Sequence, residues 1–197
     1  PGASLAALAQ QNLTSYPNAK IVISPFETWV DEQASFDLVI SATAFHWIDP
    51  AVRYQRAAQV LKSNGTIALF WNKHVQTEMS ADFFQAVQAV YERNVPEMAQ
   101  KFIGLPHPSA IPTPIKEEID RSDLFGTVEI RTYKWNKTYN AADYINLLNT
   151  YSDHRALDDS TRKALFLDIA ELINVRFGGQ IIKEYLTVLY LAHRQYL

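Results

Sequence analysis

The sequence predicts an α/β fold with a doubly wound, mostly parallel, Rossmann-like sheet. Two observations carry this prediction. Residues 38–40 form a short, unbroken apolar run, which is typical of a strand that is covered on both faces. Such runs alternate along the chain with stretches whose apolar residues recur at helical spacing, in the order strand, helix, strand. A parallel sheet flanked by helices satisfies both patterns.

The first half of the chain supplies the alternating helices and strands. Pro25 ends one strand, because proline cannot donate a hydrogen bond to a central ladder. Asp49 and Pro50 begin a helix, as N-cap and first helical residue, and Asn64-Gly65 ends it. From these signals we expect helices at residues 4–13 and 50–63 and strands at residues 21–24, 36–41 and 66–71. The last two strands and the helix between them form a βαβ unit.

The second half of the chain departs from this rhythm over residues 74–123. Apolar spacing predicts a helix over residues 83–91, and the four prolines at positions 106, 108, 112 and 114 then predict a loop. Side-chain alternation predicts a half-exposed edge strand over residues 128–139. The remaining elements are a helix at residues 141–151, a helix that Asp158 caps and Gly178-Gly179 ends, and a last strand at residues 181–192.

Composition excludes several classes of function. The chain has 197 residues and no cysteine, which favours one domain over residues 1–197 and excludes disulfides, thiolate metal ligands and cysteine nucleophiles. Its net charge of −3 is spread over interspersed charges, so no field attracts nucleic acid. No apolar run reaches the roughly 18 residues that a membrane span needs. We therefore predict a cytoplasmic protein that binds neither nucleic acid nor membrane, and its oligomeric state stays open.

Polar and aromatic residues follow the strand at residues 36–41. The chain leaves the sheet there through small residues and then Phe45, His46 and Trp47, at the carboxyl end where open α/β sheets bind their ligands. Trp71 and Asn72 end the next strand at the same edge. His46 is either a general base that binds substrate or a packed ring beside two aromatic neighbours. The edge of the sheet is thus the first candidate site.

Other polar groups give weaker signals. Tyr151, Asp153 and His154 resemble a phenol, carboxylate and imidazole set, or else a solvated helix end. His74 and His107 have no partner at the spacing of metal ligands, so we predict no metal site. The chain lacks the G-x-S-x-G elbow of serine hydrolases and the P-loop of nucleotide hydrolases.

Two segments of the sequence resemble a known family. The strings FDLVISATAFHWIDP and VLKSNGTIALFWN are similar to the fourth strand, fourth helix and fifth strand of class I S-adenosylmethionine-dependent methyltransferases. The nearest subgroup acts on small molecules and includes trans-aconitate methyltransferase. The resemblance implies S-adenosylmethionine as cofactor, methyl transfer to an oxygen or nitrogen of a small-molecule acceptor, and a last strand that runs antiparallel to its neighbours. The signature for exocyclic amines of nucleic acids is absent.

The resemblance also implies roles for individual residues. His46 is the expected catalytic residue. The expected cofactor-binding residues are Pro1, Phe26, Glu27, Ser41, Ala42 and Thr43, and the expected substrate-binding residues are Phe45, Trp47, Trp71, Asn72 and Tyr151. Within the single domain, residues 1–72 would form the cofactor-binding core, residues 73–123 an insertion on the substrate side, and residues 124–197 the C-terminal strands and helices.

The chain departs from the family pattern at two places. None of its six glycines falls in a glycine-rich cofactor loop, so we expect that the N-terminal part of the domain, with the first strand and this loop, is missing from the chain. Pro25 stands where an acidic residue usually binds the adenine amine, and Glu27 is the substitute acceptor. Two alternatives therefore remain: a catalytically silent binding module with this fold, and a nicotinamide-dependent dehydrogenase, which the sheet alone does not distinguish.

Overall fold

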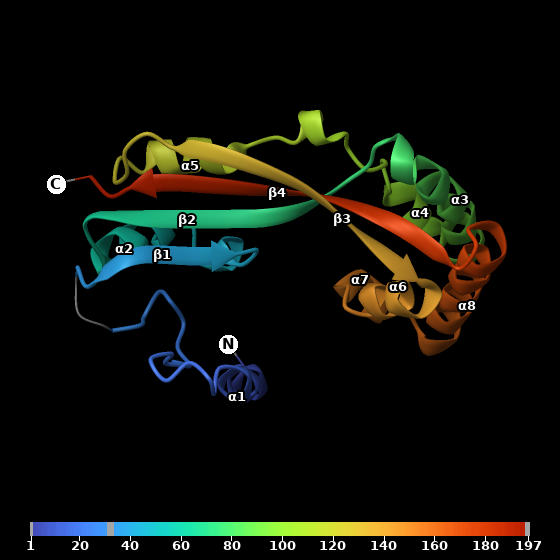
Figure 1. The fold of residues 1–197 in the computed structure, drawn as a ribbon, viewed down its shortest axis with the longest axis horizontal. Coiled ribbons are helices and arrows are strands. Elements are labelled where there is room, and N and C mark those ends of the chain that lie inside the picture. Colours follow the sequence, from blue (N-terminus) through green and yellow to red (C-terminus); the bar gives the residue numbers. More distant parts are fainter. Residues whose placement is uncertain (1, 31–33, 196–197) are drawn as a thin grey trace. The chain divides into compact units, whose positions relative to one another are not determined.

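The computed structural model describes residues 2–30 and 34–195 and contains a four-stranded mixed sheet in the order β1-β2-β4-β3 (Figure 1). Strands β1 and β2 are parallel, and the other neighbours are antiparallel. The strands are β1 Phe36–Ala42, β2 Leu61–Val75, β3 Glu129–Asn140 and β4 Gln180–His193. The predicted α/β fold is confirmed, and so is the antiparallel last strand.

Helices occupy most of the remaining chain. The α-helices are α1 Ala3–Asn12, α2 Arg53–Val60, α3 Glu78–Asn94, α4 Pro96–Lys101, α5 Pro114–Arg121, α6 Ala141–Leu148, α7 Ser152–Arg155 and α8 Asp159–Arg176. Two short 3₁₀ helices, Phe45–Trp47 and Pro108–Ala110, complete the set. Within the described residues, no helix combines the length and the apolar character that crossing a bilayer requires.

The described residues fall into two compact units, and strands β2, β3 and β4 contribute to both. The first unit contains the chain up to Trp71, Thr113–Arg131 and the chain from Leu189 onward. The second contains Asn72–Pro112 and Thr132–Val188. The second unit thus begins one residue before the segment 73–123 that we expect on the substrate side.

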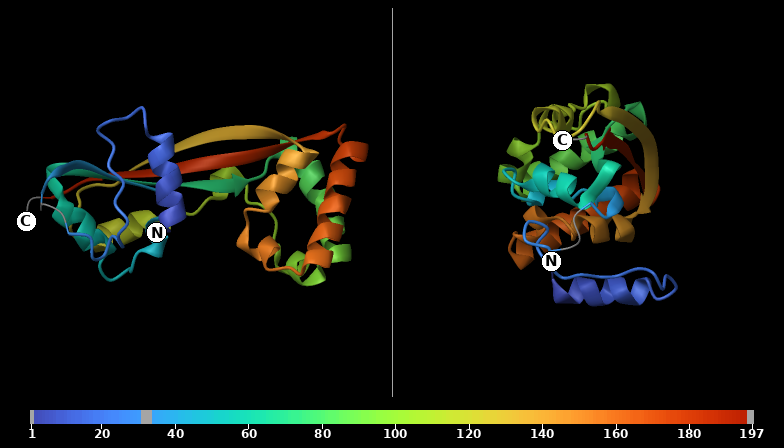
Figure 2. Two further views of the ribbon diagram at one scale, coloured as in Figure 1. Left: turned by 90° about the horizontal axis from the view of Figure 1, so that it is seen from below. Right: turned by 90° about the vertical axis from the view of Figure 1, so that its left-hand side faces the viewer.

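In the first unit, helices α2 and α5 lie on one face of the sheet (Figures 1 and 2). Helix α2 buries Tyr54, Ala57 and Ala58, and the fully buried Leu61 follows it at the start of β2. The helix covers Arg53–Val60 and not residues 50–63: residues 50–52 form a turn in which the Asp49 side chain accepts the Ala51 N–H, and β2 begins at Leu61, before the expected stop at Asn64-Gly65.

In the second unit, helices α3, α6 and α8 pack against one another. Helix α8 contributes Leu165, Ile169 and Ile173 to this core, and all three are fully buried. Asp158 caps this helix by accepting the N–H groups of Ser160 and Thr161, as expected. After the helix, Gly178 and Gly179 adopt φ values of +62° and +86°, a left-handed conformation that glycine takes without strain.

Two predictions about strands near the N-terminus are wrong. Residues 21–24 form no strand, and Ile21, Val22 and Ile23 are exposed to solvent. A strand needs a hydrogen-bonding neighbour, and among the described residues β1 pairs only with β2. For the same reason β1 is an edge strand that is not covered on both faces: Leu38 and Ile40 are 49% and 63% exposed.

The expected proline-rich loop is only partly a loop. Pro114 begins α5, and another proline, Pro96, begins α4. Proline suits the first helical position, because its missing N–H has no partner there in any helix. The sequence was correct about the break in the α/β rhythm and about the helix over residues 83–91, which α3 contains, and it was wrong about Pro114, which begins a helix.

Candidate functional site

The carboxyl end of β1 turns sharply away from the sheet. Thr43 adopts φ +52°, and its N–H donates to the carbonyl of Phe70 on β2 at 2.8 Å. The 3₁₀ helix Phe45–Trp47 follows directly. Ser41 is half-buried, whereas Ala42 and Thr43 are exposed. The first unit therefore presents backbone and small side chains at the edge where the sequence predicts a cofactor site.

His46 and Trp71 contact one another at this edge. The indole N–H of Trp71 donates to Nδ1 of His46 at 3.2 Å. An indole nitrogen only donates, so Nδ1 of the imidazole must be the acceptor, and in the neutral ring the proton lies on Nε2. While this contact holds, exposed His46 offers a hydrogen-bond donor at Nε2 and has no lone pair there with which to accept a proton.

The two aromatic neighbours of His46 lie in opposite environments. Phe45 is 1% exposed, with its ring 5.2 Å from Tyr54 and the guanidinium of Arg53 5.6 Å from its centroid. Trp47 is 80% exposed, and its ring centroid lies 4.9 Å from that of His46. Phe45 is thus a core residue here, and Trp47 offers its face to a ligand.

The remaining residues predicted for cofactor and substrate have partners of their own. Phe26 stacks on Trp29 with centroids 6.4 Å apart, and one carboxylate oxygen of Glu27 accepts the Asp49 N–H at 3.2 Å. In the second unit, the side-chain oxygen of Asn72 accepts the hydroxyl of Thr187 at 2.6 Å. Pro1, which is also predicted to bind the cofactor, lies outside the described residues.

The second unit contains a cavity of about 390 Å³. Its polar lining comes from the end of β2, from the helices α3, α4, α6 and α7, and from β4. The polar residues include His74, Tyr91, Tyr151, Asp153, His154 and Lys183, and the apolar ones include Phe84, Val87, Met98, Phe102, Leu105 and Leu148. Tyr151 therefore lines this cavity, whereas the other predicted substrate residues do not.

A chain of hydrogen bonds joins three of these residues. Asp153 lies 2.8 Å from Nδ1 of His154, and Nε2 of the same ring lies 2.7 Å from the Tyr91 hydroxyl. The phenol, carboxylate and imidazole arrangement that the sequence suggested is real, but Tyr91 supplies the hydrogen-bonded phenol. Burial, reinforced by the charge of Asp153, raises the pKa of Tyr91 above its ordinary value, so the hydroxyl stays protonated.

His74 and Tyr151 form a second polar pair in the cavity. The Tyr151 hydroxyl lies 3.5 Å from Nε2 of His74, a long contact. Burial lowers the pKa of His74 to about 4, and the nearby positive charge of Lys183 contributes. Burial, together with Tyr139 and Asp153, raises the pKa of Tyr151 to about 12. Both groups are therefore neutral near pH 7.

Lys183 is the buried cation of the cavity. Its side chain is 4% exposed, and its ammonium lies 5.2 Å and 5.6 Å from the ring centroids of Phe84 and Tyr185. No carboxylate in the described part of the chain forms an ion pair with it. Burial lowers the pKa of Lys183 to about 8.

Sequence reasoning missed His74, Tyr91 and Lys183 as members of one site. A signal for Lys183 was present: side chains of a strand alternate between its faces, and Lys183 shares a face with Ile181 and Tyr185, both buried. A lysine at an inward position of an apolar strand is unusual. Among the described residues, no group of three or more His, Asp or Glu side chains lies close enough to hold a metal ion.

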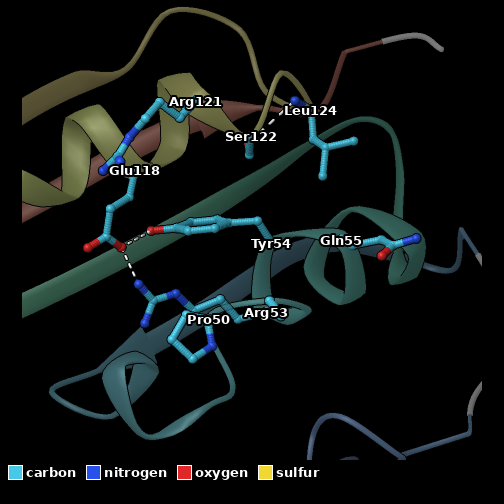
Figure 3. A pocket seen from close by; sticks show the side chains of 9 residues that line it. Pro50, Arg53, Tyr54, Gln55, Glu118, Arg121, Ser122 and Leu124 are labelled. Atoms are coloured by element: carbon cyan, nitrogen blue, oxygen red, sulfur yellow. Dashed lines mark hydrogen bonds and ion pairs between the residues drawn. The ribbon is translucent and has the colours of Figure 1, made fainter.

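The first unit also contains a hollow, of about 710 Å³, between α2 and α5 (Figure 3). One carboxylate oxygen of Glu118 accepts hydrogen bonds from Arg53 and, at 3.0 Å, from the Tyr54 hydroxyl. Burial, with the charge of Glu118, raises the pKa of Tyr54. The opposite charges are thus already paired, and the cluster serves to join α2 to α5.

A comparison with known protein families matches the segment that contains the edge of β1. Residues 2–69 match the family model of a methyltransferase domain. This segment includes β1, the turn at Thr43 and the 3₁₀ helix with His46. No curated protein sequence matches the chain.

Solved structures share the fold over most of the chain. A proposed type II methyltransferase from Anaeromyxobacter dehalogenans is 18% identical, with a TM-score of 0.57 over 91% of this chain and 73% of that one. A proposed methyltransferase from Bacillus halodurans is 14% identical, with a TM-score of 0.52 over 99% and 80%. The YcgJ protein from Bacillus subtilis is also 14% identical, with a TM-score of 0.52 over 98% and 78%. At these identities the likeness shows a Rossmann-like methyltransferase fold.

Proposed function

We propose that the protein is an S-adenosylmethionine-dependent methyltransferase that passes a methyl group to an oxygen or nitrogen of a small molecule. The observation that carries this proposal is the match of residues 2–69 to a methyltransferase domain, because this segment contains the edge of β1. A cavity of small-molecule size in the second unit favours a small acceptor over a macromolecule. The subgroup of trans-aconitate methyltransferase and a cytoplasmic location stay predictions.

The residues at the β1 edge fit the methionine end of the cofactor. A sulfonium cation is attracted to the face of an aromatic ring, and Trp47 exposes its indole beside His46. Ala42 and Thr43 are exposed small residues at the same turn. At the adenine end, Glu27 uses one oxygen for the Asp49 N–H, and its second oxygen is the acceptor we propose for the adenine amine. Phe26 would cover the adenine ring.

When bound, S-adenosylmethionine supplies an activated methyl group, so the protein's task is to align the acceptor and exclude water. We assign His46 an orienting role in this task. The contact with Trp71 holds the ring with its Nε2–H outward, which suits donation of a hydrogen bond to an acceptor oxygen. A carboxylate acceptor is ionised at neutral pH and needs no base, whereas a general-base role would require His46 to break its contact with Trp71.

Titration calorimetry with S-adenosylmethionine tests the cofactor assignment. We expect the Trp47→Ala variant to bind it about fivefold more weakly than the unsubstituted protein, from the loss of an exposed cation–π contact. Tyr133→Ala removes another exposed aromatic residue, on β3, and should leave the affinity unchanged. Absence of binding would favour the silent module, and binding of a nicotinamide dinucleotide would favour the dehydrogenase.

A further inference from the structure

Lys183 gives the cavity of the second unit a charge without a counter-charge. A buried ammonium is costly unless it is paired, and here its described neighbours are the rings of Phe84 and Tyr185. Cation–π contacts offset only part of that cost. An anionic ligand in the cavity would supply the missing partner.

The other charged groups near the cavity do not serve as this partner. The carboxylate of Asp153 accepts from His154. Glu184 follows Lys183 on β4, and its carboxylate is held by the hydroxyls of Thr77 and Ser80 at 2.8 Å and 2.6 Å. Lys101 also lines the cavity and is exposed, so it adds positive charge. The cavity is therefore positive overall.

We propose that this cavity binds a small carboxylic acid with an apolar or aromatic body, and that Lys183 is the counter-ion of its carboxylate. A carboxylate matches a site with one buried cation, whereas a phosphate dianion calls for more cationic donors. The apolar side chains of the lining suit a hydrophobic body, and a volume of about 390 Å³ suits a small one.

Neutral groups of the cavity add specificity. The Tyr151 hydroxyl makes only the long contact with His74, so it is available to donate to the second carboxylate oxygen. Nδ1 of His154 faces a carboxylate and therefore carries a proton, which leaves Nε2 to accept the Tyr91 O–H. The Tyr91 oxygen is then an acceptor for a hydroxyl or amine of the ligand. The inference that this acid binds in the cavity does not depend on the proposed function. The inference that the acid is also the methyl acceptor rests on the proposed function.

A binding titration without any cofactor tests this inference. The probes are phenylacetate, its uncharged analogue phenylacetamide, phenyl phosphate and inorganic phosphate. We expect phenylacetate to bind at least tenfold more tightly than phenylacetamide, because only the acid pairs with Lys183. Equal binding of acid and amide, tighter binding of either phosphate, or no binding of any probe would overturn the proposal.

Three lysine variants make the test specific. Lys183→Met removes the ammonium but keeps an unbranched apolar side chain, and it should weaken phenylacetate binding about 30-fold or more, with little effect on phenylacetamide. Lys163→Met removes the same charge from an exposed position on α8 and should leave both affinities unchanged. A thermal melt shows whether Lys183→Met is folded, and Lys183→Arg, which keeps the charge, should retain more acid binding than the methionine variant. Unchanged acid binding in folded Lys183→Met would overturn the proposal. Acid binding without methyl transfer would instead count against the proposed function.

Discussion

The two units keep their functional groups in opposite environments. In the first unit, Thr43, His46 and Trp47 stand exposed at the end of an edge strand. In the second, His154 and Lys183 are each 4% exposed inside a lined cavity. The exposed groups of the first unit remain solvated by water and are accessible to a ligand. Burial shifts the pKa of Lys183 from its ordinary value, so the properties of this group come from the packing around it.

The largest expected difference between the units concerns packing. Ile169 is fully buried on α8, so Ile169→Ala should lower the free energy of unfolding by about 2–5 kcal/mol. Ile40 on β1 is mostly exposed, and Ile40→Ala should change the free energy of unfolding by about 0.5 kcal/mol or less. Urea unfolding of both variants measures the contrast. A similar loss in the two would mean that the exposed face of β1 is covered in solution.

The buried charge of Lys183 should also affect the free energy of unfolding. Burial lowers the pKa of Lys183 from 10.5 to about 8, which corresponds to about 3 kcal/mol against the charged form. Below pH 8 the lysine is protonated in both states, so the full cost is present and Lys183→Met should raise the unfolding free energy.

The pH dependence gives the sign of this effect. Between pH 8 and 10.5 the unfolded chain binds a proton that folded Lys183 has released, so the stability of the unsubstituted protein rises with pH. Lys183→Met should lack this rise, and denaturant titrations at pH 7.5 and 9.5 compare the two. Parallel pH profiles would show that Lys183 is not buried as a cation.

His74 should produce a smaller effect at lower pH. Burial lowers the pKa of His74 from 6.5 to about 4, so its contribution to stability is complete above pH 6.5 and is lost as the pH falls toward 4. We expect about 2 kcal/mol, allowing for solvent screening at this half-buried position. His74→Gln should flatten the profile between pH 6.5 and 4, whereas replacement of exposed His107 by Gln should not. The reverse result would locate the titrating group elsewhere.

The smallest effect concerns the tautomer of His46. Trp71→Phe removes the indole N–H that donates to Nδ1, so the ring should change from one tautomer, with the proton on Nε2, to a mixture of two. Nitrogen-15 chemical shifts of the imidazole measure this directly. A single unchanged tautomer in the variant would mean that another group orients His46.

Local sequence patterns predicted most of the elements. The helix caps at Asp158 and Gly178-Gly179 and the last strand all appear where expected. These signals succeed because helix periodicity and end chemistry act between residues that are close in sequence. The expected strand at residues 21–24 failed, because a strand depends on a neighbour that no local pattern supplies.

The sequence by itself determined the α/β class of this protein and pointed to the edge of β1. It could do so because the strand and the aromatic residues 45–47 that follow it are close neighbours in the sequence. Only the tertiary structure decided that Phe45 is buried while Trp47 is exposed. It alone brought Lys183 and His74, which are more than a hundred residues apart, to one cavity. Burial and proximity of distant residues arise from packing, and packing sets the charge state on which the acid-binding proposal depends.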